Sequence, residues 1–181
     1  QEGTYFDALL KYTITYDKRN SAYRPSRGFV SNWTQELPLL SDGMTVLNGY
    51  RITGYKEMLD EMILTMSFSA NAATSIRSNT DVRVSKRLFI SQNRLRGFKS
   101  GKVGPKDVND FVGGNYSTSF NAQTTLPFLF PTFEKIDFLL FFDAANLWHV
   151  DYSKNVDQGN EIRSSTGVGV NFISPIGPLN F

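Results

Sequence analysis

The sequence predicts an all-β protein whose antiparallel strands form a meander, and three observations lead to that prediction. Apolar and polar residues alternate over most of the 181 residues, and a period of two is the side-chain period of a β-strand. The alternating segments are about ten residues long and are separated by turn-forming residues. No segment has the 3.6-residue period of an amphipathic helix. We therefore expect about eight strands in sequence.

The alternation places the strands one after another along the chain. It is clearest over residues 61–71, where one face is wholly apolar and the other nearly wholly polar. Residues 136–148 are apolar on both faces, but Asp137 and Asp143 share one parity. The predicted strands are residues 8–17, 27–37, 45–55, 61–71, 115–127, 136–148 and 162–172, with a last strand beginning at 178–181.

The links between these strands differ in length on the two sides of the predicted sheet. One side has the short links 55–60, 127–135 and 174–178 and the medium link 18–26. The other side has links 38–43 and 149–161 and one long segment, residues 72–114. A loop of that length inside a compact domain is usually functional or disordered. Residues 72–114 contain neither a low-complexity stretch nor a block of like charges. We therefore expect this segment to be ordered.

Strand length and loop asymmetry favour a transmembrane β-barrel over a soluble β-sandwich, whose strands also alternate. Strands of about ten residues suit a tilted crossing of a bilayer core about 30 Å thick. Aromatic residues near the strand ends suit an interfacial girdle, which would contain Tyr5, Phe29, Trp33, Tyr50, Tyr116 and Trp148. An open sheet edge cannot face lipid. We therefore expect the chain either to belong to a longer barrel or to pair with another copy.

Composition excludes several other classes of protein. The chain has no cysteine, so a disulfide framework and Cys-based zinc sites are ruled out. His149 is its only histidine, so a metal site built from several histidines is excluded. A single histidine also gives no basis for assigning a Ser-His-Asp catalytic triad. A net charge of +2 gives no reason to expect nucleic acid as a partner. We expect no metal, no cofactor and no enzymatic activity.

Five short motifs follow one another in the second half of the sequence. They are Leu95-Arg96-Gly97-Phe98, Gly113-Gly114-Asn115, the segment 141–148 ending in Trp148, the Arg163 segment containing Gly167-Val168-Gly169, and Ser174-Pro175-Ile176-Gly177-Pro178-Leu179. In this order they resemble the BamA family, the bacterial outer-membrane barrel assembly insertases of the surface antigen superfamily. Ala145 stands where that family has glycine. The turn from Asp17 to Gly28 resembles an earlier family motif.

The resemblance implies a sixteen-stranded barrel, of which residues 1–181 would form the eighth strand to the start of the fifteenth. The long extracellular loop would be residues 72–114, and the periplasmic POTRA domains and the terminal strand would lie outside the chain. The implied function is insertion of β-barrel proteins into the outer membrane. The implied partners are unfolded client proteins, accessory lipoproteins, and outer-membrane lipids including lipopolysaccharide. The alternatives are a related translocator of the two-partner or autotransporter-assembly type, and a soluble β-sandwich binding module.

In the family, the long loop folds back into the lumen, where its arginine meets acidic wall residues. Parity places Asp143 on the lumen face, so the resemblance makes it the partner of Arg96. Gly97 would allow a tight backbone and Phe98 an apolar anchor. A second acidic position of the family falls on Gln123, which is neutral here, so we expect a hydrogen bond there. The last motif favours bacterial over mitochondrial relatives.

Overall fold

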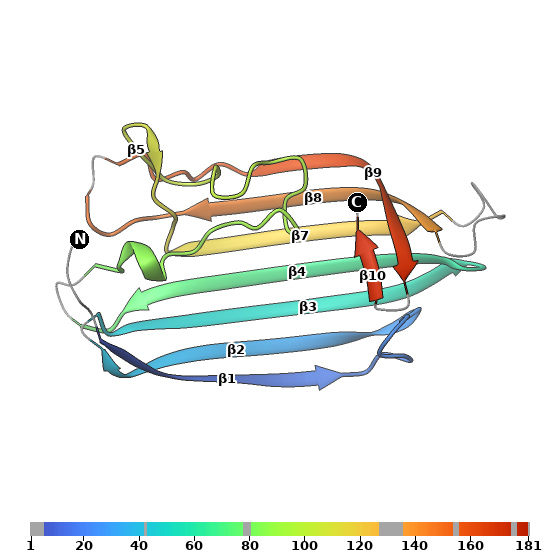
Figure 1. Cartoon of the computed structure of the whole chain (residues 1–181), viewed down its shortest axis with the longest axis horizontal. Helices are drawn as coiled ribbons and strands as arrows, with labels where there is room; N and C mark the ends of the chain where they lie inside the picture. Colours follow the sequence, from blue (N-terminus) through green and yellow to red (C-terminus); the bar gives the residue numbers. More distant parts are fainter. Residues whose placement is uncertain are drawn as a thin grey trace.

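Eight of the ten described strands form one continuous antiparallel sheet. The computed structural model describes residues 6–41, 43–77, 81–126, 136–153, 156–174 and 177–180. Eight strands pair in the order β1-β2-β3-β4-β7-β8-β9-β10, so neighbours in the sheet are also consecutive in the main meander (Figure 1). Their bounds are β1 Asp7–Asp17, β2 Arg27–Ser41, β3 Thr45–Leu59, β4 Met62–Ser75, β7 Tyr116–Thr125, β8 Ile136–Trp148, β9 Arg163–Ser174 and β10 Gly177–Asn180. The all-β meander is confirmed, and a second sheet of sandwich type is absent from the described residues.

Several strands are longer than the alternation predicted. Strand β2 continues through Pro38, which the sequence placed in a loop, because a register shift between Ala8 and Leu9 gives β2 an extra residue there. Strand β3 runs to Leu59, so the predicted link 55–60 shrinks to a tight turn. Strand β4 runs to Ser75 because its last residues still pair with the start of β3. The predicted loop 72–114 therefore begins four residues later, at residue 76.

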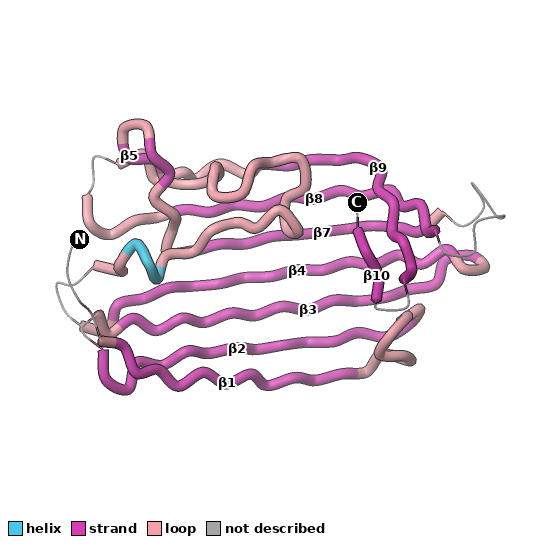
Figure 2. Tube along the Cα trace, viewed as in Figure 1, coloured by secondary structure: helices cyan, strands magenta, loops and turns pink. Residues whose placement is uncertain are grey.

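The long loop covers one face of the sheet, which we call the inner face. It contains a short 3-10 helix, η1 (Val84–Lys86), and a two-stranded hairpin of β5 (Lys106–Asp107) and β6 (Asp110–Phe111). Figure 2 shows it as a mostly irregular path over β7 and β8. An apolar cluster lies between loop and sheet and consists of Ile90, Leu95, Val103, Ala145 and Leu147.

The two faces of the sheet are reversed relative to a soluble protein. On β4, the inner-face side chains Ser67 and Ser69 are buried, at 6% and 3% exposure. The alternating Met66 and Phe68 on the outer face are 45% and 42% exposed. Cross-strand hydrogen bonds satisfy the buried hydroxyls, as between Ser69 and Ser119 at 2.7 Å. A polar covered face and an apolar exposed face are what a membrane barrel requires.

The predicted aromatic girdle lies only partly at strand ends: Tyr116 begins β7, Trp148 ends β8 and Phe29 is near the start of β2. The prediction was wrong for Trp33 and Tyr50, which pair with each other in the interior of β2 and β3. Phe29, Trp33 and Tyr50 are exposed, while Tyr116 and Trp148 pack against each other with ring centroids 5.9 Å apart. The predicted girdle residue Tyr5 lies outside the described residues. No helix among the described residues is long and apolar enough to cross a membrane.

Candidate functional site

The centre of the site is a bidentate ion pair between the long loop and β8. Arg96 Nε and Nη2 each lie 2.7 Å from a carboxylate oxygen of Asp143. The backbone N–H of Arg96 donates a third hydrogen bond to the same carboxylate at 3.1 Å. Asp143 is fully buried and Arg96 is 28% exposed. The contact that the family resemblance implied, and with which strand parity agreed, is therefore present, in the fork geometry that makes arginine–carboxylate pairs specific.

Two polar side chains of β7 complete the hydrogen bonding of this pair. Asn121 Nδ2 donates to Asp143 Oδ1 at 2.8 Å and to the Arg94 carbonyl oxygen at 2.9 Å. Gln123 Oε1 accepts from Arg96 Nη1 at 3.1 Å. The Gln123 contact is the hydrogen bond expected, in place of a second salt bridge, where the family has a second acid. With four donors around its carboxylate, Asp143 can remain charged inside the protein.

Phe141 is a contact of Arg96 that the sequence analysis did not single out. The Arg96 guanidinium carbon lies 3.8 Å from the centroid of the Phe141 ring, within range of a cation–π interaction. The ring lies against Gly167 of β9, where an added Cβ would come within 2.9 Å of it. Phe141 has the inner-face parity of Asp143, and so does Asn121, which faces Asp143 across the strands. Parity combined with strand register could have identified both.

The other residues of the loop tetrapeptide hold the loop in place. Leu95 is buried in the apolar cluster, and Phe98 packs against its edge. Gly97 has φ +81°, a left-handed conformation that side chains other than glycine rarely adopt. Leu95, Gly97 and Phe98 thus place the Arg96 head group beside β7 and β8.

The remaining motif residues build the surroundings of the loop. Gly113 and Gly114 lead into β7, where the Leu88–Gly114 bridge and a hydrogen bond from Asn115 N–H to the His149 carbonyl oxygen fix the chain. Gly169 lines the cavity beside Arg96. Gly177 and Pro178 lie in β10, and Pro175 lies outside the described residues, as does the side chain of Asp137.

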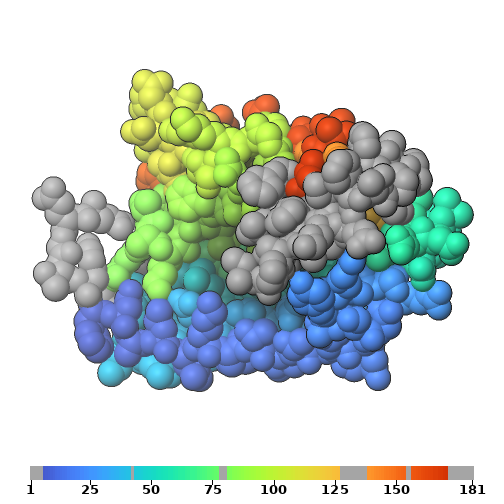
Figure 3. Space-filling view, turned by 45° about the vertical axis from the view of Figure 1, so that its right-hand side comes forward, coloured from blue at the N-terminus to red at the C-terminus, as the bar shows by residue number. Residues whose placement is uncertain are grey.

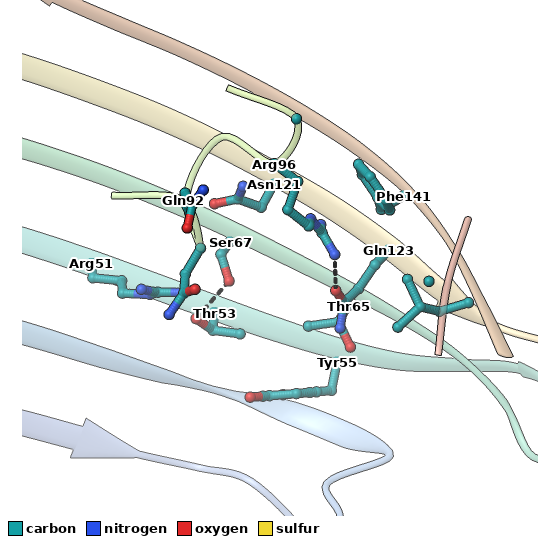
Figure 4. Close-up of a pocket in the computed structure, with 14 residues that line it drawn as sticks. Arg51, Thr53, Tyr55, Thr65, Ser67, Gln92, Arg96, Asn121, Gln123 and Phe141 are labelled. Atoms are coloured by element: carbon teal, nitrogen blue, oxygen red, sulfur yellow. Dashed lines mark hydrogen bonds between the residues drawn. The ribbon is translucent and has the colours of Figure 1, made fainter. Parts of the chain in front are cut away.

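A cavity of about 510 Å³ lies beside the ion pair, between the loop tip and the inner face. Figure 4 shows Arg96, Gln123 and Phe141 at one side of it and Arg51 and Gln92 at another. Its lining is mainly amide, hydroxyl and aromatic. The described residues contain no cluster of His, Asp and Glu side chains that could hold a metal ion.

A second contact joins the long loop to the loop that follows β8. The Tyr152 hydroxyl donates to Asp107 Oδ2 at 2.7 Å, and the Arg87 guanidinium lies 4.5 Å from the Tyr152 ring centroid. Burial raises the pKa of the Tyr152 hydroxyl, and its bond to Asp107 raises that pKa further. Tyr152 therefore stays neutral and joins the two loops at ordinary pH.

These features define a class of protein: a membrane β-barrel whose long loop folds inward and is fixed to the wall by an arginine–aspartate pair. The sequence agrees with that class, because the profile of the Omp85 superfamily domain matches residues 1–181. The chain belongs to the Omp85 superfamily.

Individual relatives support the resemblance to the BamA family. The chain is 25% identical to the outer membrane protein assembly factor BamA of Neorickettsia risticii, over 98% of this chain and 24% of that protein. It is 27% identical to the sorting assembly machinery 50 kDa subunit of Saccharomyces cerevisiae, over 100% of this chain and 40% of that protein. The crystal structure of Haemophilus ducreyi BamA lacking POTRA domains 1–3 has the same fold, with a TM-score of 0.81 and 24% identity over 96% of this chain and 37% of that chain.

The chain therefore spans well under half the length of these relatives. They include a bacterial protein and a yeast protein that are both named for assembly.

Proposed function

We propose that residues 1–181 form about half of the wall, together with the locked loop, of an outer-membrane β-barrel that folds and inserts other β-barrel proteins. The observation that carries the proposal is the loop held inside a superfamily barrel by Arg96 and Asp143. Relatives that share this region are named as assembly factors. The activity is non-enzymatic and needs no cofactor.

The physical basis of such an activity is strand addition. A client strand that pairs with an open barrel edge forms its backbone hydrogen bonds before it enters lipid, where unpaired groups would be costly. Both strands of such a seam lie outside residues 1–181 in the family's strand order. The contribution of this chain is therefore a rigid wall and a fixed loop, which keep the rest of the barrel in register.

The proposed location is the outer membrane, as an integral barrel. The partners are unfolded outer-membrane client proteins and accessory lipoproteins of an assembly complex. Outer-membrane lipids, lipopolysaccharide included, would contact the exposed apolar face carrying Met66, Phe68 and their neighbours.

The test is reconstitution of the full-length protein into liposomes, followed by addition of an unfolded outer-membrane client. Folding is measured as the heat-modifiable fraction of the client on a gel. Liposomes with the protein should fold the client several times faster than empty liposomes. Equal rates would refute the proposal.

A secretion translocator of the same superfamily is the second candidate, since the same fold and loop would suit it. Protease protection separates the two functions in the same liposomes. An inserted client remains in the membrane fraction, whereas a translocated client is released into the opposite compartment.

A further inference from the structure

Two arginines on the inner face have no acidic partner among the described residues. Arg51 lies on β3 and Arg94 on the long loop, and both line a second cavity of about 360 Å³. The space-filling view shows the loop, in green and yellow, next to the blue surface of the first strands (Figure 3). Lys11 of β1 adds a third positive charge to the lining. The one carboxylate in the lining, Glu36, is already paired with Lys86 at 3.1 Å.

Arg94 is half-buried and Arg51 is exposed in the lining of the same cavity, where their positive charges repel each other. Burial lowers the pKa of Arg94 below its usual range, and the positive charge of Arg51 lowers it further. Neither side chain has a hydrogen bond or ion pair among the described residues. Two like charges that line one cavity, one of them partly withdrawn from solvent, create a positive potential that favours binding of an anion.

Among the described residues, the strands next to Arg51 offer no unpaired carboxylate to this cavity. Arg51 lies on the third strand of the sheet, so described strands flank it on both sides. Its cross-strand partners are Asn32 on β2 and Ser69 on β4, which are both neutral. Arg94 lies on the loop, away from any sheet edge. A counter-charge must therefore reach the pair from the barrel interior.

The chemistry of the cavity favours a carboxylate on a polypeptide. A guanidinium presents two parallel N–H groups that match a carboxylate, and two such groups can hold one or two acidic side chains. A lipid phosphate is disfavoured because Arg51 pairs with the inner-face residue Ser69 and Arg94 lies on the loop that covers that face, both opposite the exposed apolar side chains of the outer face.

We propose that Arg51 and Arg94 form a binding site for acidic side chains of a polypeptide segment that enters the barrel interior. The inference rests on the proposed function, which brings unfolded clients to this protein. Arg51 belongs to the wall and Arg94 to the long loop, so the site lies between the two. A bound acidic segment would therefore contact the fixed loop as well as the sheet.

The test compares two fluorescent peptides that differ only in having Glu or Gln at alternate positions. Each is titrated against the full-length protein in detergent micelles, and binding is followed by fluorescence anisotropy. The Glu peptide should bind at least about tenfold more tightly than the Gln peptide, as expected for charge-assisted hydrogen bonds. Arg51→Gln and Arg94→Gln should each lower the ratio of the Glu-peptide affinity to the Gln-peptide affinity by about tenfold. Arg94→Lys should keep part of it, because the charge remains.

The matched control is Lys99→Gln, which removes an exposed positive charge from the same loop outside this cavity. It should leave the preference unchanged. Equal binding of the two peptides by the native protein would overturn the inference, and so would an equal loss in the Lys99 variant. If Arg51→Gln and Arg94→Gln both lower the heat stability of the peptide-free barrel, an internal carboxylate already occupies the site and the inference is also wrong.

Failure of the site can be told apart from failure of the proposed function. A protein that folds clients in liposomes but does not distinguish the peptides overturns only the acidic-segment site. A protein that distinguishes the peptides but does not speed client folding overturns the insertase function and leaves the site standing.

Discussion

Removing Arg96 should destabilise the barrel more than removing its partner. In Arg96→Ala, the buried Asp143 carboxylate loses the two bonds from the guanidinium and keeps two neutral donors, Asn121 Nδ2 and the backbone N–H of residue 96. Leaving a buried charge without its counter-ion costs about 3–5 kcal/mol, and the remaining donors place the expected cost near the lower end. In Asp143→Ala, Arg96 is part-exposed and keeps Gln123 and Phe141, so about 2–3 kcal/mol is expected.

The double variant tests whether the two side chains act as one unit. It contains neither an unpaired acid nor an unpaired guanidinium, so it should cost no more than Arg96→Ala alone. The coupling energy should then be at least about 2 kcal/mol. The measurement is urea unfolding of the full-length protein in detergent, followed by tryptophan fluorescence, with heat-modifiable gel migration as a second readout. Gln123→Ala serves as a control, because loss of one neutral acceptor should cost about 1 kcal/mol. Additive single effects would refute the pairing.

Three further outcomes follow from the same contacts. Gly97→Ala should lower stability by about 1–2 kcal/mol in the same urea assay, because φ +81° is strained for alanine; an unchanged midpoint would show that the loop tip relaxes freely. Gln123→Glu should place a carboxylate where the Gln123 oxygen now accepts a hydrogen bond from Arg96 at 3.1 Å, and should increase stability by up to about 1 kcal/mol, seen as a higher temperature of the heat-modifiable transition. A lower transition temperature would mean that the cost of burying the second carboxylate dominates. The stability that the Tyr152–Asp107 contact contributes should be complete below about pH 10, the ordinary tyrosine value, and should be lost as pH rises through the raised pKa of the folded hydroxyl. Limited proteolysis of the loop at pH 9 and pH 11 should show this in the native protein and not in Tyr152→Phe.

The sequence predicted the sheet well because the pattern that specifies it is local. Alternation and turn-forming residues together predicted the eight strands. In β8, which is apolar on both faces, the shared parity of Asp137 and Asp143 put Asp143 on the inner face. Strand ends were less predictable, since Pro38 lies within β2 only because a bulge accommodates it. Ser75 extends β4 because β3 still offers pairing partners there. Both effects depend on the neighbouring strand, which a pattern along one segment does not contain.

The site was predictable in part for the same reason. Arg96 and Asp143 could be paired because a family motif and strand parity pointed to the same contact. Asn121 and Phe141 were not singled out, because their roles arise from register across β7, β8 and β9. The proximity of Arg51 to Arg94 required the three-dimensional path of the loop, which no local pattern encodes.

The long loop is tied to widely separated strands of the sheet. Its root is held by Arg83, 3.7 Å from Asp7 on β1, and by Lys86, 3.1 Å from Glu36 on β2.

The tip of the loop is held by Asp143 on β8, so the loop crosses the inner face from the first strands to the sixth strand of the sheet. Hydroxyl and amide groups on this face are largely paired with one another, as in Thr53 with Ser67 at 2.8 Å and Asn71 with Ser117 at 3.0 Å. They offer few free partners to a displaced loop tip. Loss of the Arg96 pair should therefore release the tip from the wall while the root stays attached. The loop would then no longer connect the first strands of the sheet to β8.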